Sequence, residues 1–101
     1  MIWKEVYHWM ESKDHVNSAW GCIGATDSSF YAEDEFENTF ISMFTRGDGE
    51  LIVYVGMMRP KISVGGSTGI IVNSHYDVID YLEDNLENMY DELMEKARNN
   101  V

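Results

Sequence analysis

The sequence predicts an α+β fold: one compact domain with an N-terminal helix, a mainly antiparallel sheet of about four strands and a long acidic C-terminal helix. Three observations lead to this prediction. Apolar residues recur at helical spacing near both ends of the chain, two β-prone runs flank a glycine-containing turn in the middle, and Pro60 and further glycines punctuate the rest. No repeat or linker divides the 101 residues, so we expect a single domain over residues 1–101.

The first predicted element is a short amphipathic helix over residues 2–13. Its apolar residues recur at helical spacing: Trp3, Val6, Tyr7 and Met10. If Trp3 faces the core, Trp9 projects well around the helix, so we expect Trp9 to be exposed and able to anchor an interface. The small residues and glycines that follow disfavour a helix and predict a strand over residues 19–25.

The middle of the chain carries the clearest sheet signal. The stretch "NTFISMFTRGDGELIVYVGMM" contains two β-prone runs around a turn sequence, which predicts a β-hairpin. The apolar run 51–55 is typical of a central strand covered on both faces. The run before the turn also fits a helical stripe over residues 36–44 that ends at Gly47, but its β-branched and aromatic residues favour the strand.

Two further short strands are expected at residues 61–64 and 69–73, and the long helix follows them. Ser74 is positioned to cap this helix, with Asp77 three residues later in a variant of the capping box. Lys96 and Arg98 lie at its C-terminal end, where the macrodipole favours cations. Its apolar residues recur at steps of three and four and predict one buried stripe: Ile79, Leu82, Leu86, Met89, Tyr90, Leu93 and Ala97.

The charge of the chain limits the partners it can bind. It carries 18 acidic and 7 basic side chains, for a net charge of −11. Such a surface repels phosphate backbones and anionic membranes, so we expect no direct binding of nucleic acid or lipid, and it attracts basic proteins. No apolar run approaches the roughly 20 residues of a membrane span. The lone Cys22 and the lack of a recognisable signal peptide favour a cytoplasmic location.

The acidic residues of the last helix follow a regular pattern. Six of them fall on the side opposite the apolar stripe and form what we term the acidic ridge: Asp77, Asp80, Asp84, Glu87, Asp91 and Glu95. At 1.5 Å rise per residue the ridge is about 27 Å long, with neighbours about 4.5 to 6 Å apart along the axis. This step is comparable with the spacing of phosphates along a nucleic-acid strand, which advances about 3.4 Å per nucleotide.

The ridge predicts a docking surface for a basic protein. Tyr81 falls near the ridge and is a candidate hot spot within the charge. A second acidic cluster, Glu33, Asp34, Glu35 and Glu37, would extend the field if it folds nearby, and the sequence leaves that open. In composition and charge pattern the chain resembles, as a class, phage and mobile-element inhibitors of host nucleases and nucleic-acid enzymes. The resemblance implies that the protein is a nucleic-acid mimic, and that it inhibits a DNA- or RNA-binding protein or a nuclease.

Two alternatives remain open: an adaptor or homodimer whose acidic surface only confers solubility, and a small enzyme with an unrecognised site. No catalytic motif surrounds any serine, so we expect no enzyme and assign no catalytic residue. The spacing of His8, His15 and Cys22 matches no zinc pattern, and the glycine-rich stretch "VGGSTG" lacks the lysine of a phosphate-binding loop. We therefore expect no metal and no cofactor.

Overall fold

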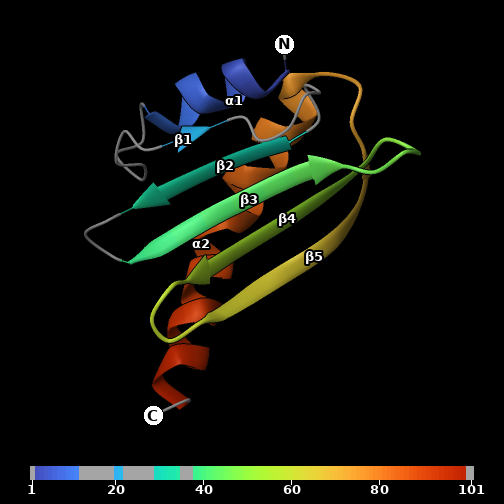
Figure 1. Cartoon of the computed structure of the whole chain (residues 1–101). Helices are drawn as coiled ribbons and strands as arrows, with labels where there is room; N and C mark the ends of the chain where they lie inside the picture. Colours follow the sequence, from blue (N-terminus) through green and yellow to red (C-terminus); the bar gives the residue numbers. More distant parts are fainter. Residues whose placement is uncertain (1, 12–19, 22–28, 35–37, 100–101) are drawn as a thin grey trace.

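The structure, a computed structural model, describes residues 2–11, 20–21, 29–34 and 38–99. Within these ranges, two helices and five strands follow one another in the order α1 (Ile2–Glu11), β1 (Trp20–Gly21), β2 (Ser29–Asp34), β3 (Thr39–Thr45), β4 (Glu50–Met57), β5 (Ile62–Ile71) and α2 (His75–Asn99). The strands form one antiparallel sheet in the order β1-β2-β3-β4-β5, and both helices lie on the same side of it (Figure 1). The predicted α+β fold is confirmed, with four full strands and the two-residue β1 at one edge.

The two faces of the sheet have different environments. One register row runs through Ala32, Ile41, Val55 and Val64, which are all buried in the core beneath the helices. The adjacent row runs through Glu33, Phe40, Gly56 and Ser63 and points to the other side, because successive side chains of a strand alternate between faces. No described helix covers that second side, which we term the open face.

The α1 helix is confirmed and ends at Glu11. Trp3, Val6 and Met10 are buried, and the Trp3 ring lies 6.1 Å from that of Phe30 on β2. The expectation for Trp9 is corrected, because this side chain is only partly exposed and packs against the core.

The β3–β4 hairpin is confirmed, and the helical alternative for residues 36–44 is wrong where the chain is described, from Thr39 onward. Its turn is closed by backbone hydrogen bonds from Arg46 N to Glu50 O (2.9 Å) and from Gly49 N to Arg46 O (2.8 Å). Gly49 takes a positive φ of 88° that glycine adopts without strain. The expectation that residues 51–55 are covered on both faces is wrong, since Tyr54 points to the open face and is 38% exposed.

A single strand, β5, replaces the two short strands predicted at 61–64 and 69–73. Gly65 and Gly66 lie inside it at φ 112° and 144°, so glycines that signal a loop in sequence instead bend a continuous strand. A β-carbon on Gly65 would lie 2.2 Å from the Val53 carbonyl oxygen and 2.9 Å from Met89 Cε, so the glycine lets α2 approach the sheet.

Two other differences concern the first strands. The β2 strand was not predicted, because its sequence "SFYAED" ends in acidic residues that strands usually lack. Of the strand predicted at 19–25, the structure contains β1 at Trp20–Gly21, and residues 19 and 22–25 lie outside the described ranges.

The α2 helix begins at His75, directly after the predicted cap residue Ser74. The buried stripe consists of Val78, Leu82, Leu86, Met89 and Leu93, whereas Ile79, Tyr90 and Ala97 are only partly buried. The centre of the buried stripe is therefore rotated around the helix axis toward Val78 relative to the prediction. The reason is that α2 packs against β4, β5 and α1 at once. Neither described helix has the length and apolar character needed to cross a membrane.

Candidate functional site

The acidic ridge lies on the outer side of α2, opposite the buried stripe. Five of its six members are exposed: Asp80, Asp84, Glu87, Asp91 and Glu95. Glu83 and Glu92, on the two flanks of the ridge, are exposed as well. The long straight helix thus presents a continuous row of carboxylates to solvent.

No basic side chain of the described residues forms an ion pair with a carboxylate of the ridge. The ion pairs among the described residues lie instead at the β3–β4 hairpin turn, where they join Arg46 Nη2 to Asp48 (3.3 Å) and to Glu50 (2.5 Å). Arg98 follows Glu95 by three residues on the same side of α2, yet no ion pair links it to a described carboxylate. The ridge carboxylates are therefore free of ion pairs within this part of the chain.

Asp77 differs from the other ridge members. It is half-buried, and its Oδ2 accepts hydrogen bonds from the backbone N–H groups of Asn73 (2.6 Å) and Ser74 (3.1 Å). These contacts satisfy backbone donors at the helix start, which is the role of the third residue in a capping box. Asp77 thus has a structural role in the helix cap.

Tyr81 lies on a flank of α2 and is half-buried, packed against the core. Its hydroxyl donates a long hydrogen bond to Met89 Sδ (3.9 Å), and burial raises its pKa above the ordinary value. Only part of the ring is available to a partner.

Of the second acidic cluster, Glu33 does not lie beside the ridge. Glu33 is on the open face, where its Oε1 accepts a hydrogen bond from the Tyr31 hydroxyl (2.7 Å), whereas α2 packs beneath β4 and β5 on the opposite face. Asp34 ends β2, and Glu35 and Glu37 lie outside the described residues. Glu33 therefore does not lengthen the ridge.

The β4–β5 turn and the C-terminal part of α2 lie at the same end of the molecule (Figure 1), and these two segments carry four of the seven basic residues: Arg59, Lys61, Lys96 and Arg98. The Lys96 ammonium donates a hydrogen bond to the Ser63 carbonyl oxygen (3.0 Å), which joins the end of α2 to the start of β5. The turn is also tied to the residue before β3, because Asn38 Nδ2 donates to the Arg59 carbonyl oxygen (2.7 Å). Helix, turn and sheet are thus held together at the basic end.

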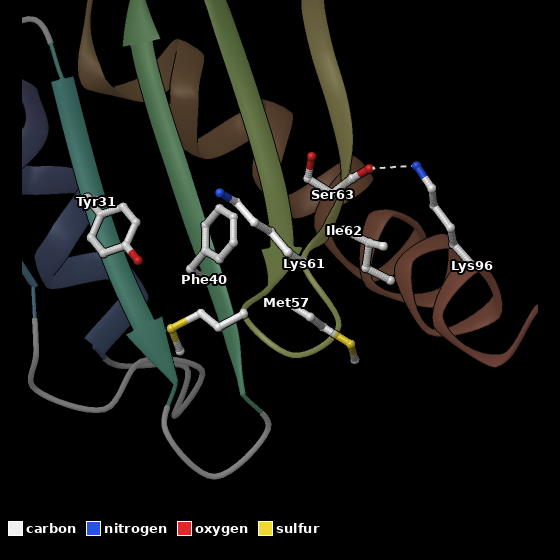
Figure 2. Close-up of a pocket in the computed structure, with 8 residues that line it drawn as sticks. Tyr31, Phe40, Met57, Lys61, Ile62, Ser63 and Lys96 are labelled. Carbon is white, nitrogen blue, oxygen red and sulfur yellow. Dashed lines mark hydrogen bonds between the residues drawn. The ribbon is translucent and has the colours of Figure 1, made fainter. Parts of the chain in front are cut away.

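An open pocket of about 680 Å³ lies at this end, and we term it the β4–β5 pocket (Figure 2). Its lining includes Tyr31, Phe40, Met57, Met58, Lys61 and Lys96. The Tyr31 and Phe40 rings are stacked with centroids 5.8 Å apart and an interplanar angle of 25°. Sequence reasoning missed this pocket, and the only signal for it was the pair of basic residues around Pro60 and the pair near the chain end.

Two further observations define the aromatic wall of the pocket. A β-carbon on Gly56 would lie 2.4 Å from Phe40 Cζ, so the Phe40 ring rests directly on the glycine backbone. Burial, and then the hydrogen bond to Glu33 and its charge, raise the pKa of Tyr31 to about 12. Tyr31 is therefore a neutral hydrogen-bond donor at physiological pH.

No cluster of three metal-ligating side chains occurs among the described residues. Of the residues considered as zinc ligands, His8 is exposed and His75 is half-buried, while His15 and Cys22 lie outside the described ranges.

No protein-family model matches the chain, and searches of curated proteins and of solved structures give no significant match.

Proposed function

We propose that the protein binds a positively charged protein surface through the acidic ridge, and that it does so in place of nucleic acid. The observation that supports this proposal is the row of exposed carboxylates from Asp80 to Glu95, which has no ion-pair partner in the described chain. The proposed role is inhibitory and non-catalytic, directed at a DNA- or RNA-binding protein or nuclease.

The stability of the helix does not account for the ridge. Like charges four residues apart on a helix destabilise it by about 0.2 to 0.5 kcal/mol per pair, and a glutamate–lysine pair at the same spacing would stabilise it. The macrodipole disfavours acids near the C-terminus, where Asp91 and Glu95 lie. A cationic partner would offset this repulsion on binding, and steered association of this kind is fast and salt-sensitive.

The test compares two double variants with the same change in net charge. Asp84→Lys with Asp91→Lys places lysines on the ridge, and the matched control, Glu83→Lys with Glu92→Lys, places them on its flanks. Each variant and the wild type are immobilised, and proteins captured from a lysate are identified by mass. We expect the ridge variant alone to lose a basic nucleic-acid-binding protein that the wild type retains.

Two properties of the captured protein complete the test. Its complex should weaken strongly between about 50 and 200 mM salt, as contacts to phosphates do. A duplex oligonucleotide should also displace it if the ridge occupies its nucleic-acid site. Equal loss of capture by both double variants would mean that only net charge matters, and the ridge would not be the contact surface.

A second candidate function is favoured by the open face. Phe44 and Tyr54 are 37% and 38% exposed there, and Ile52 and Ser42 lie between them in the register. The four full strands, about 4.8 Å apart and on average about 25 Å long, present roughly 500 Å² per copy, so two copies face to face bury about 1,000 Å², which is near the smallest area of a specific interface. A homodimer of this kind leaves both acidic ridges outside.

Sedimentation equilibrium distinguishes this candidate. If the open face pairs, Tyr54→Glu converts a dimer into a monomer, whereas Tyr76→Glu, at a 65% exposed aromatic on α2, leaves the dimer intact. A monomeric wild-type protein at about 100 μM would exclude an affinity in the micromolar range.

A further inference from the structure

The β4–β5 pocket has a charge opposite to that of the molecule. In a chain of net charge −11, Lys61 and Lys96 both line one pocket that has no carboxylate in its lining, although Lys96 also lines a neighbouring pocket with Glu92 and Glu95. Neither forms an ion pair with a carboxylate of the described residues. A cation that converges on a pocket without a local carboxylate partner provides a recognition group for an anion.

The geometry of the two lysines gives them different roles. Lys61 is exposed and extends from the β4–β5 turn toward Phe40 and Tyr31 (Figure 2). Lys96 is on the far side of Ser63, where one of its three N–H donors is used by the Ser63 carbonyl oxygen. Lys61 is therefore the direct contact for an anion near the rings, whereas the charge of Lys96 is shared with Glu92 and Glu95, which line the neighbouring pocket with it.

The wall of the pocket suits a flat apolar group. Phe40 and Tyr31 present a stacked aromatic pair, and Met57 and Met58 supply adaptable thioether surface beside it. The volume of about 680 Å³ falls within the range of about 300 to 1,000 Å³ that small-molecule sites occupy. Glu33, hydrogen-bonded to Tyr31, disfavours an anion on that side and directs it toward Lys61.

From these observations we propose that the β4–β5 pocket binds a small ligand in which a planar aromatic ring carries an anionic group. The ring stacks against Phe40 and Tyr31, and the anion is held by Lys61. The site is separate from the acidic ridge and takes ligands of the opposite charge, so it does not depend on the function proposed for α2.

The test uses two fluorescent probes that share their rings. 1-Anilinonaphthalene-8-sulfonate carries an anion, and N-phenyl-1-naphthylamine lacks the sulfonate. We expect the anionic probe to bind one site per chain, and Lys61→Met to weaken it about tenfold or more, because a hydrogen bond to a charged group contributes about 1.5 to 3 kcal/mol. The matched control, Lys4→Met, removes an exposed lysine on α1 and should leave the affinity unchanged.

Binding of the neutral probe separates the two parts of the site. Lys61→Met should leave its affinity unaltered, whereas Phe40→Leu should weaken both probes while keeping Gly56 covered. Circular dichroism verifies that each variant is folded. The proposal would be overturned by the absence of saturable binding, by unchanged affinity of the anionic probe for Lys61→Met, or by displacement of that probe by a tetraglutamate peptide, which has no ring.

Discussion

At the scale of single residues, buried contacts around glycines and carboxylates decide how closely the elements approach. Gly65 lets Met89 of α2 reach the sheet, and Gly56 supports the Phe40 ring. Glu50 is buried, and its carboxylate accepts hydrogen bonds from Arg46, Ser67 and Gly69, which secure the bulged end of the β4–β5 pair. None of these roles follows from residue type alone.

Gly65→Ala is expected to destabilise the protein by about 2 to 4 kcal/mol, because it combines a strained positive φ with a clash against the Val53 carbonyl oxygen. Gly47→Ala is the matched control, since no atom lies within 4 Å of the added carbon. Urea unfolding followed by circular dichroism measures both. Similar stabilities for the two variants would show that α2 does not pack tightly at Gly65.

Tyr31 is expected to make stability pH-dependent at alkaline pH. Its folded-state pKa of about 12 is above the unfolded value of about 10, so the folded state holds the proton more tightly. The stabilisation is present in full below pH 10 and is lost as the pH rises toward 12. The free energy of unfolding should therefore fall less steeply over this window in Tyr31→Phe than in the wild type.

Urea titrations at several pH values between 9 and 12 measure this slope, with Tyr76→Phe, a change at an exposed tyrosine, as the control. An identical slope in Tyr31→Phe and the wild type would contradict the assigned environment of Tyr31.

At the scale of elements, α2 combines two opposed sides in one helix. One side buries Val78, Leu82 and Leu93 against the sheet, and the other carries the exposed carboxylates. Burial of the apolar side stabilises the helix far more than the repulsion between carboxylates destabilises it, because each buried aliphatic side chain contributes about 1.5 to 3 kcal/mol. The packing therefore lets the outer side carry a charge pattern that is unfavourable locally.

Asp77→Ala is expected to cost about 1 kcal/mol, because Asn73 N and Ser74 N lose their side-chain acceptor at the helix start. Asp84→Ala, farther along the ridge, should leave stability unchanged or raise it by a few tenths of a kcal/mol, since it removes a like-charge repulsion. Thermal unfolding of the two variants makes the comparison. A larger loss for Asp84→Ala would mean that the ridge stabilises the helix.

At the scale of the whole molecule, charge is segregated. The carboxylates of α2 lie along the helical side, four basic residues gather at the β4–β5 end, and the open face is lined by aromatic and small side chains. This arrangement gives three surfaces with different partner chemistry: a cationic protein for the ridge, an aromatic anion for the pocket, and an apolar surface for the open face.

Added salt is expected to raise the melting temperature of the free protein. The screening length falls from about 30 Å at 0.01 M to about 10 Å at 0.1 M, which weakens the self-repulsion of a chain of charge −11. A gain of 1 kcal/mol would raise the melting temperature by about 4 to 8 °C in a domain of this size. The melting temperature of the variant Asp84→Lys with Asp91→Lys should rise less with added salt than that of the wild type. An equal rise in the two proteins would mean that the repulsion does not come from the ridge.

Periodicity and turn chemistry predicted much of the fold. The α1 and α2 helices, the hairpin at Arg46–Gly49 and the outward side of the ridge depend on contacts within a few residues, which sequence spacing reports directly. The β2 strand and the continuous β5 strand were missed, because pairing with β3 and β4 overrides the local preferences of "SFYAED" and of the glycines at 65 and 66. The exposure of Trp9 was predicted wrongly, because the burial of this side chain depends on which elements pack against α1.

The sequence by itself determined the charge, the two amphipathic helices and the alignment of the ridge, because helical spacing fixes which side chains share a side. Only the tertiary structure decided that Glu33 lies away from the ridge and that Lys61 and Lys96 line one pocket together with Phe40. Those relations join residues distant in the chain. They depend on strand register and on how α2 packs across the sheet, which local propensity does not encode.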